Sequence, residues 1–166
     1  ACGNGMRCRR RAYFDASAMH KGLALLLLFW LPLTPFGQAP CGAPTPADME
    51  GPFYKADAPQ RASTGRGLLV MGTVRSTGSC APIPGARVEW WQANTGGQYD
   101  DAHCAVMTVG PDGRYRFETD FPAGYYGRPP HIHLKAFAPG HRTLTTQLYL
   151  KRGQTEAPFD LVLVRE

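Results

Sequence analysis

The sequence lacks an apolar run long enough to cross a bilayer, which takes about 20 residues. Its longest run, GLALLLLFWL at residues 22–31, is followed by Pro32 and Pro35, which would soon end any helix built on it. A buried helix or a membrane anchor therefore fits less well than the apolar core of a secretory signal. Small residues up to Ala39 place the expected cleavage after that residue. We predict that residues 1–39 are a signal or targeting segment, that membrane contact occurs only through it, and that the protein is exported to the periplasm or the cell exterior.

Two export routes are compatible with this segment. The stretch Arg10-Arg11-Ala12-Tyr13-Phe14 loosely matches a twin-arginine signal, which exports folded proteins. A start at Met19 would instead leave a shorter signal for general secretion. Both routes lead to an exported protein.

The chain also lacks a basic surplus outside the targeting segment. Its net charge is +5, from 18 basic and 13 acidic residues. Five of the basic residues but only one acidic residue lie in residues 1–39, so residues 40–166 carry a net charge of +1. A nucleic-acid-binding domain has clustered basic residues of its own. The charge distribution therefore argues against a nucleic-acid partner.

Cysteine is scarce, and the three cysteines that follow residue 39 are Cys41, Cys80 and Cys104. An exported protein reaches an oxidising compartment, where disulfides form and persist. We expect one disulfide and one spare thiol. The sequence does not decide which pair is joined.

No segment after residue 39 shows the apolar period of a helix. Residues 40–66 are rich in Pro, Ala and Gly and are expected to form an irregular N-terminal arm. From residue 67 to residue 166, short apolar segments alternate with turn residues, which is typical of strands. We predict an all-β fold in which this part is an antiparallel β-sandwich. The expected strands are 68–74, 86–93, 106–109, 114–118, 131–137, 143–150 and 160–164.

Two local patterns make this prediction more specific. Gly-Pro-Asp-Gly at residues 110–113 is a turn signal and predicts a hairpin between the strands on either side. In the strand over residues 86–93, alternate side chains point to opposite faces. Trp90 is therefore expected in the core and Trp91 on the sheet surface.

The stretch GYYGRPPHIH, residues 124–133, carries the chemistry. In a strand, His131 and His133 point to the same side with about 6.6 Å between their Cα atoms, so both imidazoles can reach one metal ion. The preceding Pro129-Pro130 pair fixes the backbone. Tyrosine is a poor ligand for zinc or copper, but an ionised phenol suits a hard, highly charged ion, which favours Fe(III). The alternatives are a plain exposed pair of histidines, or a copper or zinc site completed by His103.

Several segments together resemble the intradiol ring-cleavage dioxygenases, the family of catechol and protocatechuate dioxygenases. The resemblance covers most of residues 45–150, and the segments occur in the family's order. They are TPADMEGPFY (45–54), PIPGARVEWWQANTGGQY (82–99), GRYRFET (113–119), GRPPHIH (127–133) and TTQLY (145–149).

Carried over by position, this resemblance implies a set of site residues. The iron(III) ligands would be Tyr99, Tyr125, His131 and His133. Tyr125 is preferred to Tyr126, because Tyr126 fills the place of a proline that usually follows the family's ligand. Arg128 would lie beside the substrate ring, and Gln147 would be a polar residue near the site. With lower priority, Gly51, Pro52 and Tyr54 would line the pocket.

The resemblance implies a non-haem Fe(III) enzyme that uses O2 to cleave an aromatic diol between its two hydroxyl-bearing carbons. The product would be a muconate-type diacid, and no organic cofactor would be needed. The chain lacks the large helical N-terminal part of the cytosolic enzymes, which supports their dimers, so a homodimer is left open here. The competing interpretation is a non-catalytic β-sandwich module that binds carbohydrate or a surface. The sequence does not identify which catechol is the substrate.

Overall fold

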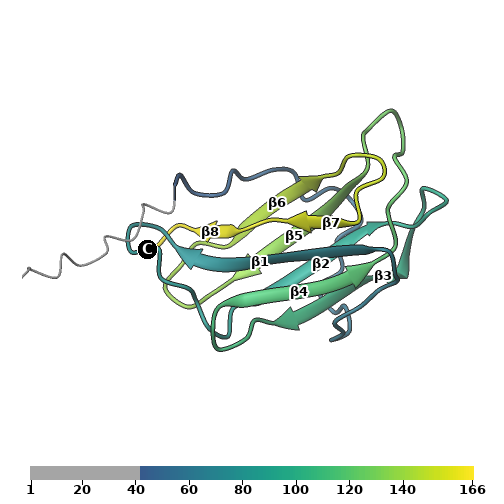
Figure 1. Ribbon diagram of the computed structural model, residues 1–166. Helices are drawn as coiled ribbons and strands as arrows, with labels where there is room; N and C mark the ends of the chain where they lie inside the picture. The colour runs from purple at the N-terminus through teal and green to yellow at the C-terminus, as the bar shows by residue number, and fades with distance from the viewer. Residues whose placement is uncertain (1–41) are drawn as a thin grey trace, which may run out of the picture. The chain divides into compact units, whose positions relative to one another are not determined.

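The computed structural model describes residues 42–166, and all regular structure in this part is β-strand (Figure 1). The predicted targeting segment and Cys41 lie outside the described residues, so export remains a prediction. Within residues 42–166 no helix long and apolar enough to cross a membrane occurs. The eight strands are β1 (Leu68–Ser76), β2 (Arg87–Ala93), β3 (Tyr99–Thr108), β4 (Arg114–Thr119), β5 (His131–Phe137), β6 (Leu144–Tyr149), β7 (Glu156–Pro158) and β8 (Leu161–Leu163).

The strands form two sheets that pack face to face, as the predicted β-sandwich requires (Figure 1). One sheet has the order β3-β2-β5-β6 and is antiparallel throughout. The other has the order β4-β1-β7, with β8 also paired to β1. Here β7 and β8 run parallel to β1, which departs from the all-antiparallel prediction. Because the chain reaches β7 from β6 in the opposite sheet, no tight hairpin forces an antiparallel pairing.

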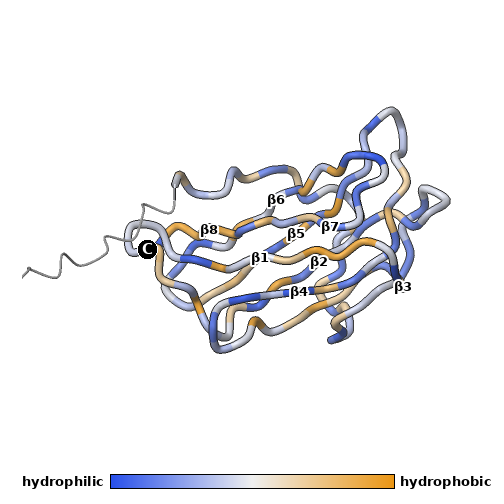
Figure 2. The backbone as a smooth tube through the Cα atoms, viewed as in Figure 1, coloured by the Kyte–Doolittle hydropathy of each residue, from blue (hydrophilic) through white to orange (hydrophobic). Residues whose placement is uncertain are grey.

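The core lies between the sheets, where apolar side chains alternate with polar ones along the strands (Figure 2). Trp90 is fully buried there and stacks on Phe117 of the other sheet, with 4.1 Å between ring centroids. Its indole Nε1 donates a hydrogen bond to Thr64 Oγ1 at 3.2 Å, so the buried donor is satisfied. The prediction that Trp90 belongs to the core is confirmed. Trp91 lies on the opposite face of β2, as predicted, but it is buried there with 3% exposure instead of lying on an open sheet surface.

The connection between β3 and β4 corrects one prediction. The turn at residues 110–113 is tight, and Gly113 N donates to Gly110 O at 3.0 Å. However, β3 pairs with β2 and β4 pairs with β1, so the turn joins the two sheets and does not close a hairpin. Turn residues determine the local backbone, but they do not determine which strand becomes the neighbour. In addition, β3 begins at Tyr99, seven residues before the predicted strand.

The arm before β1 covers the outer face of the β3-β2-β5-β6 sheet (Figure 1, dark blue). Asp48 N donates to Thr145 O of β6 at 2.9 Å. Farther along, the Tyr54 hydroxyl donates to the buried Glu89 of β2 at 2.8 Å. Between these points Lys135 of β5 pairs with Glu50 at 2.6 Å. A sheet face that would otherwise be solvated is therefore buried.

The two described cysteines have different states. Cys80 is disulfide-bonded, whereas Cys104 is a free and buried thiol on β3. The predicted spare thiol is therefore Cys104.

Gly72, in the middle of β1, allows the chain between β7 and β8 to pass close by. A methyl group at this position would overlap the carbonyl oxygen of Phe159 and touch the ring of Tyr115. We expect Gly72→Ala to lower the free energy of unfolding by about 1–3 kcal/mol, as overpacking of a core does. Urea denaturation measures this, with the exposed Arg116→Ala on neighbouring β4 as the control. Equal stability of the two variants would contradict the close approach.

Candidate metal centre

Three side chains from two strands converge on the outer face of the β3-β2-β5-β6 sheet. Tyr99 begins β3, and its hydroxyl oxygen lies 3.1 Å from Nε2 of His133 and 3.5 Å from Nε2 of His131. Both histidines lie on β5 and are almost completely buried, with 2% and 1% exposure for His131 and His133. The period of the strand places both imidazoles on one side, as predicted, and β2 separates them from the strand of Tyr99.

Both imidazoles are held in the neutral form, which is the form that binds metals. His131 Nδ1 lies 2.8 Å from the carbonyl oxygen of Pro129. Because a carbonyl only accepts, Nδ1 carries the proton and the lone pair of Nε2 faces Tyr99. Burial lowers the pKa of His131, and burial together with the neighbouring His131 lowers the pKa of His133 to about 4.

A tight turn brings the second tyrosine to the same place. Arg128 N donates to Tyr125 O at 2.8 Å, and the two residues between them, Tyr126 and Gly127, have φ of 47° and 74°. The Tyr125 ring lies 5.4 Å from the ring of Tyr99 and 5.8 Å from that of His131, between centroids. Tyr126 in contrast points into solvent and is 94% exposed. Of the two adjacent tyrosines, Tyr125 is the one beside the histidines.

The phenol of Tyr99 resists ionisation in the protein alone. Burial, followed by a hydrogen bond with Tyr125, raises its pKa above the ordinary value of 10. A neutral phenol is a weak ligand, so a cation of high charge is needed to displace the proton.

Arg128 is fixed by a hydrogen-bond network beside this cluster. Its Nη2 donates to Gln147 Oε1 at 2.7 Å and to the Tyr149 hydroxyl at 3.0 Å. The Tyr149 hydroxyl in turn donates to Asp48 Oδ2 at 3.1 Å. Gln147 Nε2 donates to Met49 O of the arm at 2.7 Å. The guanidinium is therefore held by two side chains of β6, which are themselves hydrogen-bonded to the arm.

Tyr149 and Asp48 were not predicted from the sequence. In the β5–β6 ladder, Tyr149 lies opposite His131 and Gln147 lies opposite His133. The alternation of the strand already places Gln147 and Tyr149 on one face, so this signal was present in TTQLY. Asp48 belongs to the irregular arm, whose path no period predicts.

The predicted pocket residues separate into two groups. Gly51 lies against the Cε1–Nε2 edge of His133, since a Cβ built there would be 3.3 Å from His133 Cε1. Tyr54 instead turns its hydroxyl to Glu89 and its ring to Trp91, at 5.0 Å between centroids. Pro52 and Tyr54 line a pocket of about 270 Å³ together with Trp91 and Tyr99.

Two aromatic residues pack directly on the converging side chains. Trp91 stacks on His133, with 5.0 Å between centroids and 10° between planes. Phe53 stacks on Tyr99, with 4.2 Å and 12°. These contacts restrict the rotation of both rings.

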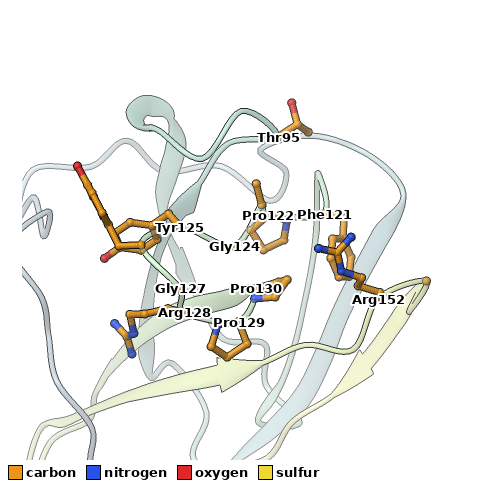
Figure 3. A pocket seen from close by; sticks show the side chains of 13 residues that line it. Thr95, Phe121, Pro122, Gly124, Tyr125, Gly127, Arg128, Pro129, Pro130 and Arg152 are labelled. Carbon is orange, nitrogen blue, oxygen red and sulfur yellow. The ribbon is translucent and has the colours of Figure 1, made fainter.

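A cleft with a volume of about 890 Å³ adjoins the loop that carries Tyr125 and Arg128. Figure 3 shows Tyr125 and Arg128 on one side of it and Arg152 on the other, with Pro129 and Pro130 between them. The imidazoles of β5 are not among its lining residues.

Comparison with known proteins agrees with this geometry. The dioxygenase domain of a dioxygenase and carbohydrate-binding fusion protein from the cellulolytic bacterium Streptomyces sp. SirexAA-E is 36% identical, with a TM-score of 0.68. The match covers 75% of this chain and all of that domain. The chain belongs to the intradiol dioxygenase family. A comparison with models of protein families gave no match.

Two further members of the intradiol dioxygenase family are similar over part of their length. A chlorocatechol 1,2-dioxygenase from Cupriavidus pinatubonensis is 32% identical, and the match covers 66% of this chain and 55% of that protein. A catechol 1,2-dioxygenase from Acinetobacter baylyi is 33% identical, with 63% of this chain and 45% of that protein covered. The chain thus spans about half the length of these relatives.

His103 does not join the two histidines of β5. Its Nδ1 lies 2.7 Å from Asp100 Oδ1 and its Nε2 lies 3.3 Å from Asp120 Oδ2, so both ring nitrogens are occupied. Among residues 42–166 no group of three or more His, Cys, Asp or Glu side chains is arranged so that it could hold a metal ion. The alternative of a copper or zinc site built from three histidines is therefore wrong.

His103 instead connects β3 to the loop that leads to Tyr125. Burial alone would lower its pKa, but hydrogen bonds to Asp100 and then Asp120 outweigh burial and raise the pKa above 6.5. The contribution of protonated His103 to the stability of the folded protein is therefore fully present below pH 6.5, and it is lost as pH rises through the folded-state pKa. We expect His103→Gln to cost about 1 kcal/mol at pH 6 and less at pH 9. Urea denaturation at both pH values measures this, and an equal loss at both would contradict the charged bridge.

Proposed function

We propose that this protein is a non-haem iron(III) dioxygenase that cleaves a catechol-type ring between its two hydroxyl-bearing carbons. It would consume O2 and form a muconate-type diacid. The observation that carries the proposal is the approach of the Tyr99 hydroxyl to the Nε2 atoms of both His131 and His133. Membership in the intradiol dioxygenase family supports the proposal. The same membership argues against the alternative of a binding module without catalytic activity.

The side chains fit a ferric ion better than a divalent metal. Tyr99, Tyr125, His131 and His133 would hold the ion. Two ionised phenols and one hydroxide would balance three positive charges, while the buried imidazoles stay neutral. When bound, Fe(III) would supply Lewis-acid and one-electron redox chemistry that makes an electron-rich diol ring reactive toward O2.

The residues of this chain would have distinct tasks in the reaction. Tyr125 lies in a turn at the edge of the cluster, so its phenol oxygen can move away and accept a proton from a substrate hydroxyl. Arg128 stays cationic, and its guanidinium, held by Gln147 and Tyr149, would stabilise negative charge on the substrate. Gly51 leaves room beside His133 that any larger residue would fill.

The reaction can be tested with iron-loaded protein, catechol and dissolved oxygen. We expect one O2 to be consumed per diol, and we expect a product whose mass is that of the diol plus both oxygen atoms. Mass spectrometry with isotopically labelled O2 identifies the origin of these atoms, and fragmentation shows which ring bond was broken. A product cleaved beside the diol, or no oxygen uptake by protein that retains iron, would exclude the proposed reaction.

The ligand role of Tyr99 has a separate test. The iron-loaded protein should absorb visible light through charge transfer from phenolate to iron. We expect Tyr99→Phe to shift or bleach this absorption and to lower iron retention by more than the roughly 10–100-fold that loss of an outer-shell partner costs, because one anionic ligand is lost. Tyr126→Phe is the matched control and should keep both the colour and the iron, since its ring is exposed. An unchanged spectrum in Tyr99→Phe would remove Tyr99 from the centre.

A further inference from the structure

The exposed apolar side chains of this protein are gathered around one place. Among residues 42–166, the large apolar or aromatic side chains that are exposed are Met49 (65%), Phe53 (41%), Tyr126 (94%) and Tyr149 (46%). They come from three separate segments, namely the arm, the loop before β5 and the end of β6. We call these four residues the apolar rim.

Each ring of the apolar rim contacts a residue of the candidate centre. Phe53 stacks on Tyr99 at 4.2 Å, and Tyr149 tilts over His131 at 5.8 Å between centroids. Tyr126 lies edge-on to Tyr125 at 5.4 Å. Met49 is connected through its backbone carbonyl, which accepts from Gln147. Exposed apolar groups that gather around a polar site are typical of binding surfaces.

The backbone at Tyr126 indicates that its exposed ring has a use. Its φ of 47° is in the left-handed region, which is unfavourable for residues other than Gly, Asn and Asp. Glycine or asparagine would suit this turn better. The chain nevertheless has a tyrosine here, with nearly all of its side chain in solvent.

The apolar rim adjoins a cleft that is larger than one aromatic ring. The cleft of about 890 Å³ is lined by Tyr125, Tyr126 and Arg128 on the side of the centre. Its other walls include Phe121, Pro122 and Pro130, and no acidic residue is among its described lining. This volume lies within the range of small-molecule binding clefts, so the cleft has room for more than one aromatic ring.

We propose that the apolar rim and the adjoining cleft bind the second ring of an aryl-substituted catechol, whose diol ring occupies the candidate centre. This inference rests on the proposed function and specifies its substrate class. The second ring would cover apolar surface on Tyr126 and Met49 that is otherwise in water, and the edge of an aromatic ring suits the face of another.

The test compares catechol with 4-phenylcatechol on the iron-loaded protein. Dissociation constants are measured without oxygen from the change in visible absorption, and kcat/KM is measured with oxygen. We expect 4-phenylcatechol to bind at least tenfold more tightly than catechol. We expect Tyr126→Ser and Met49→Ser each to reduce the ratio of the two dissociation constants roughly threefold to tenfold. Tyr126→Phe, which keeps the ring, should leave this ratio as in the unmodified protein. Thermal unfolding of each variant checks that the fold is intact.

The outcomes separate this inference from the function on which it rests. If catechol is neither bound nor cleaved by iron-loaded protein, the proposed function fails. If catechol is cleaved but the phenyl group gives no gain, or if Tyr126→Ser leaves the ratio unchanged, the aryl site is wrong. Sedimentation adds a third arm, because a dimer that Tyr126→Ser dissociates would assign the rim to subunit contact and overturn the proposal.

Discussion

The register of the β2-β5-β6 ladder is the constraint on which the site depends. Trp91, His133 and Gln147 lie directly opposite one another across the three strands. A slip of one residue would move both imidazoles of β5 into the core and expose Ile132. Ile132 and Leu134 are fully buried between the sheets, so the apolar core itself holds the histidines on the outer face.

The outer face of such a sheet would normally be exposed to solvent. Here the arm buries this face and thereby shifts the pKa values of the side chains on it. The contacts of Asp48, Glu50 and Tyr54 with β2, β5 and β6 hold the arm on the face that carries the histidines. Burial beneath the arm helps to lower the pKa of His133 to about 4, so the imidazole is neutral above that pH. The same burial opposes ionisation of the Tyr99 phenol. Desolvation therefore suppresses charge on the free protein, whereas a bound cation of high charge would stabilise the ionised form of the Tyr99 phenol.

Sequence patterns were sufficient wherever one face of a strand was apolar. Alternation along β2 and β5 predicted the separation of Trp90 from Trp91 and the common direction of His131 and His133. The patterns were insufficient where a choice of neighbour was involved. The turn at residues 110–113 has the residues of a hairpin but joins different sheets, because long-range packing chooses the partner of β4. Asp48 was missed because its hydrogen bond with Tyr149 joins residues 101 positions apart, whereas the alternation of β6 already placed Tyr149 on the same face as Gln147.

The turn between Tyr125 and Arg128 connects the chemistry to the surface. Two consecutive residues with positive φ reverse the chain within four residues, so adjacent tyrosines end in opposite environments. Tyr125 turns toward Tyr99 and His131, while Tyr126 turns to solvent and lies edge-on to Tyr125. The turn also carries Arg128. If Tyr125 moved in the proposed reaction, the backbone of the turn would move too, and it would shift both the Arg128 guanidinium and the Tyr126 ring. In the proposed reaction, a group bound against Tyr126 would restrain this turn, so recognition outside the centre and proton transfer within it would act on one piece of backbone.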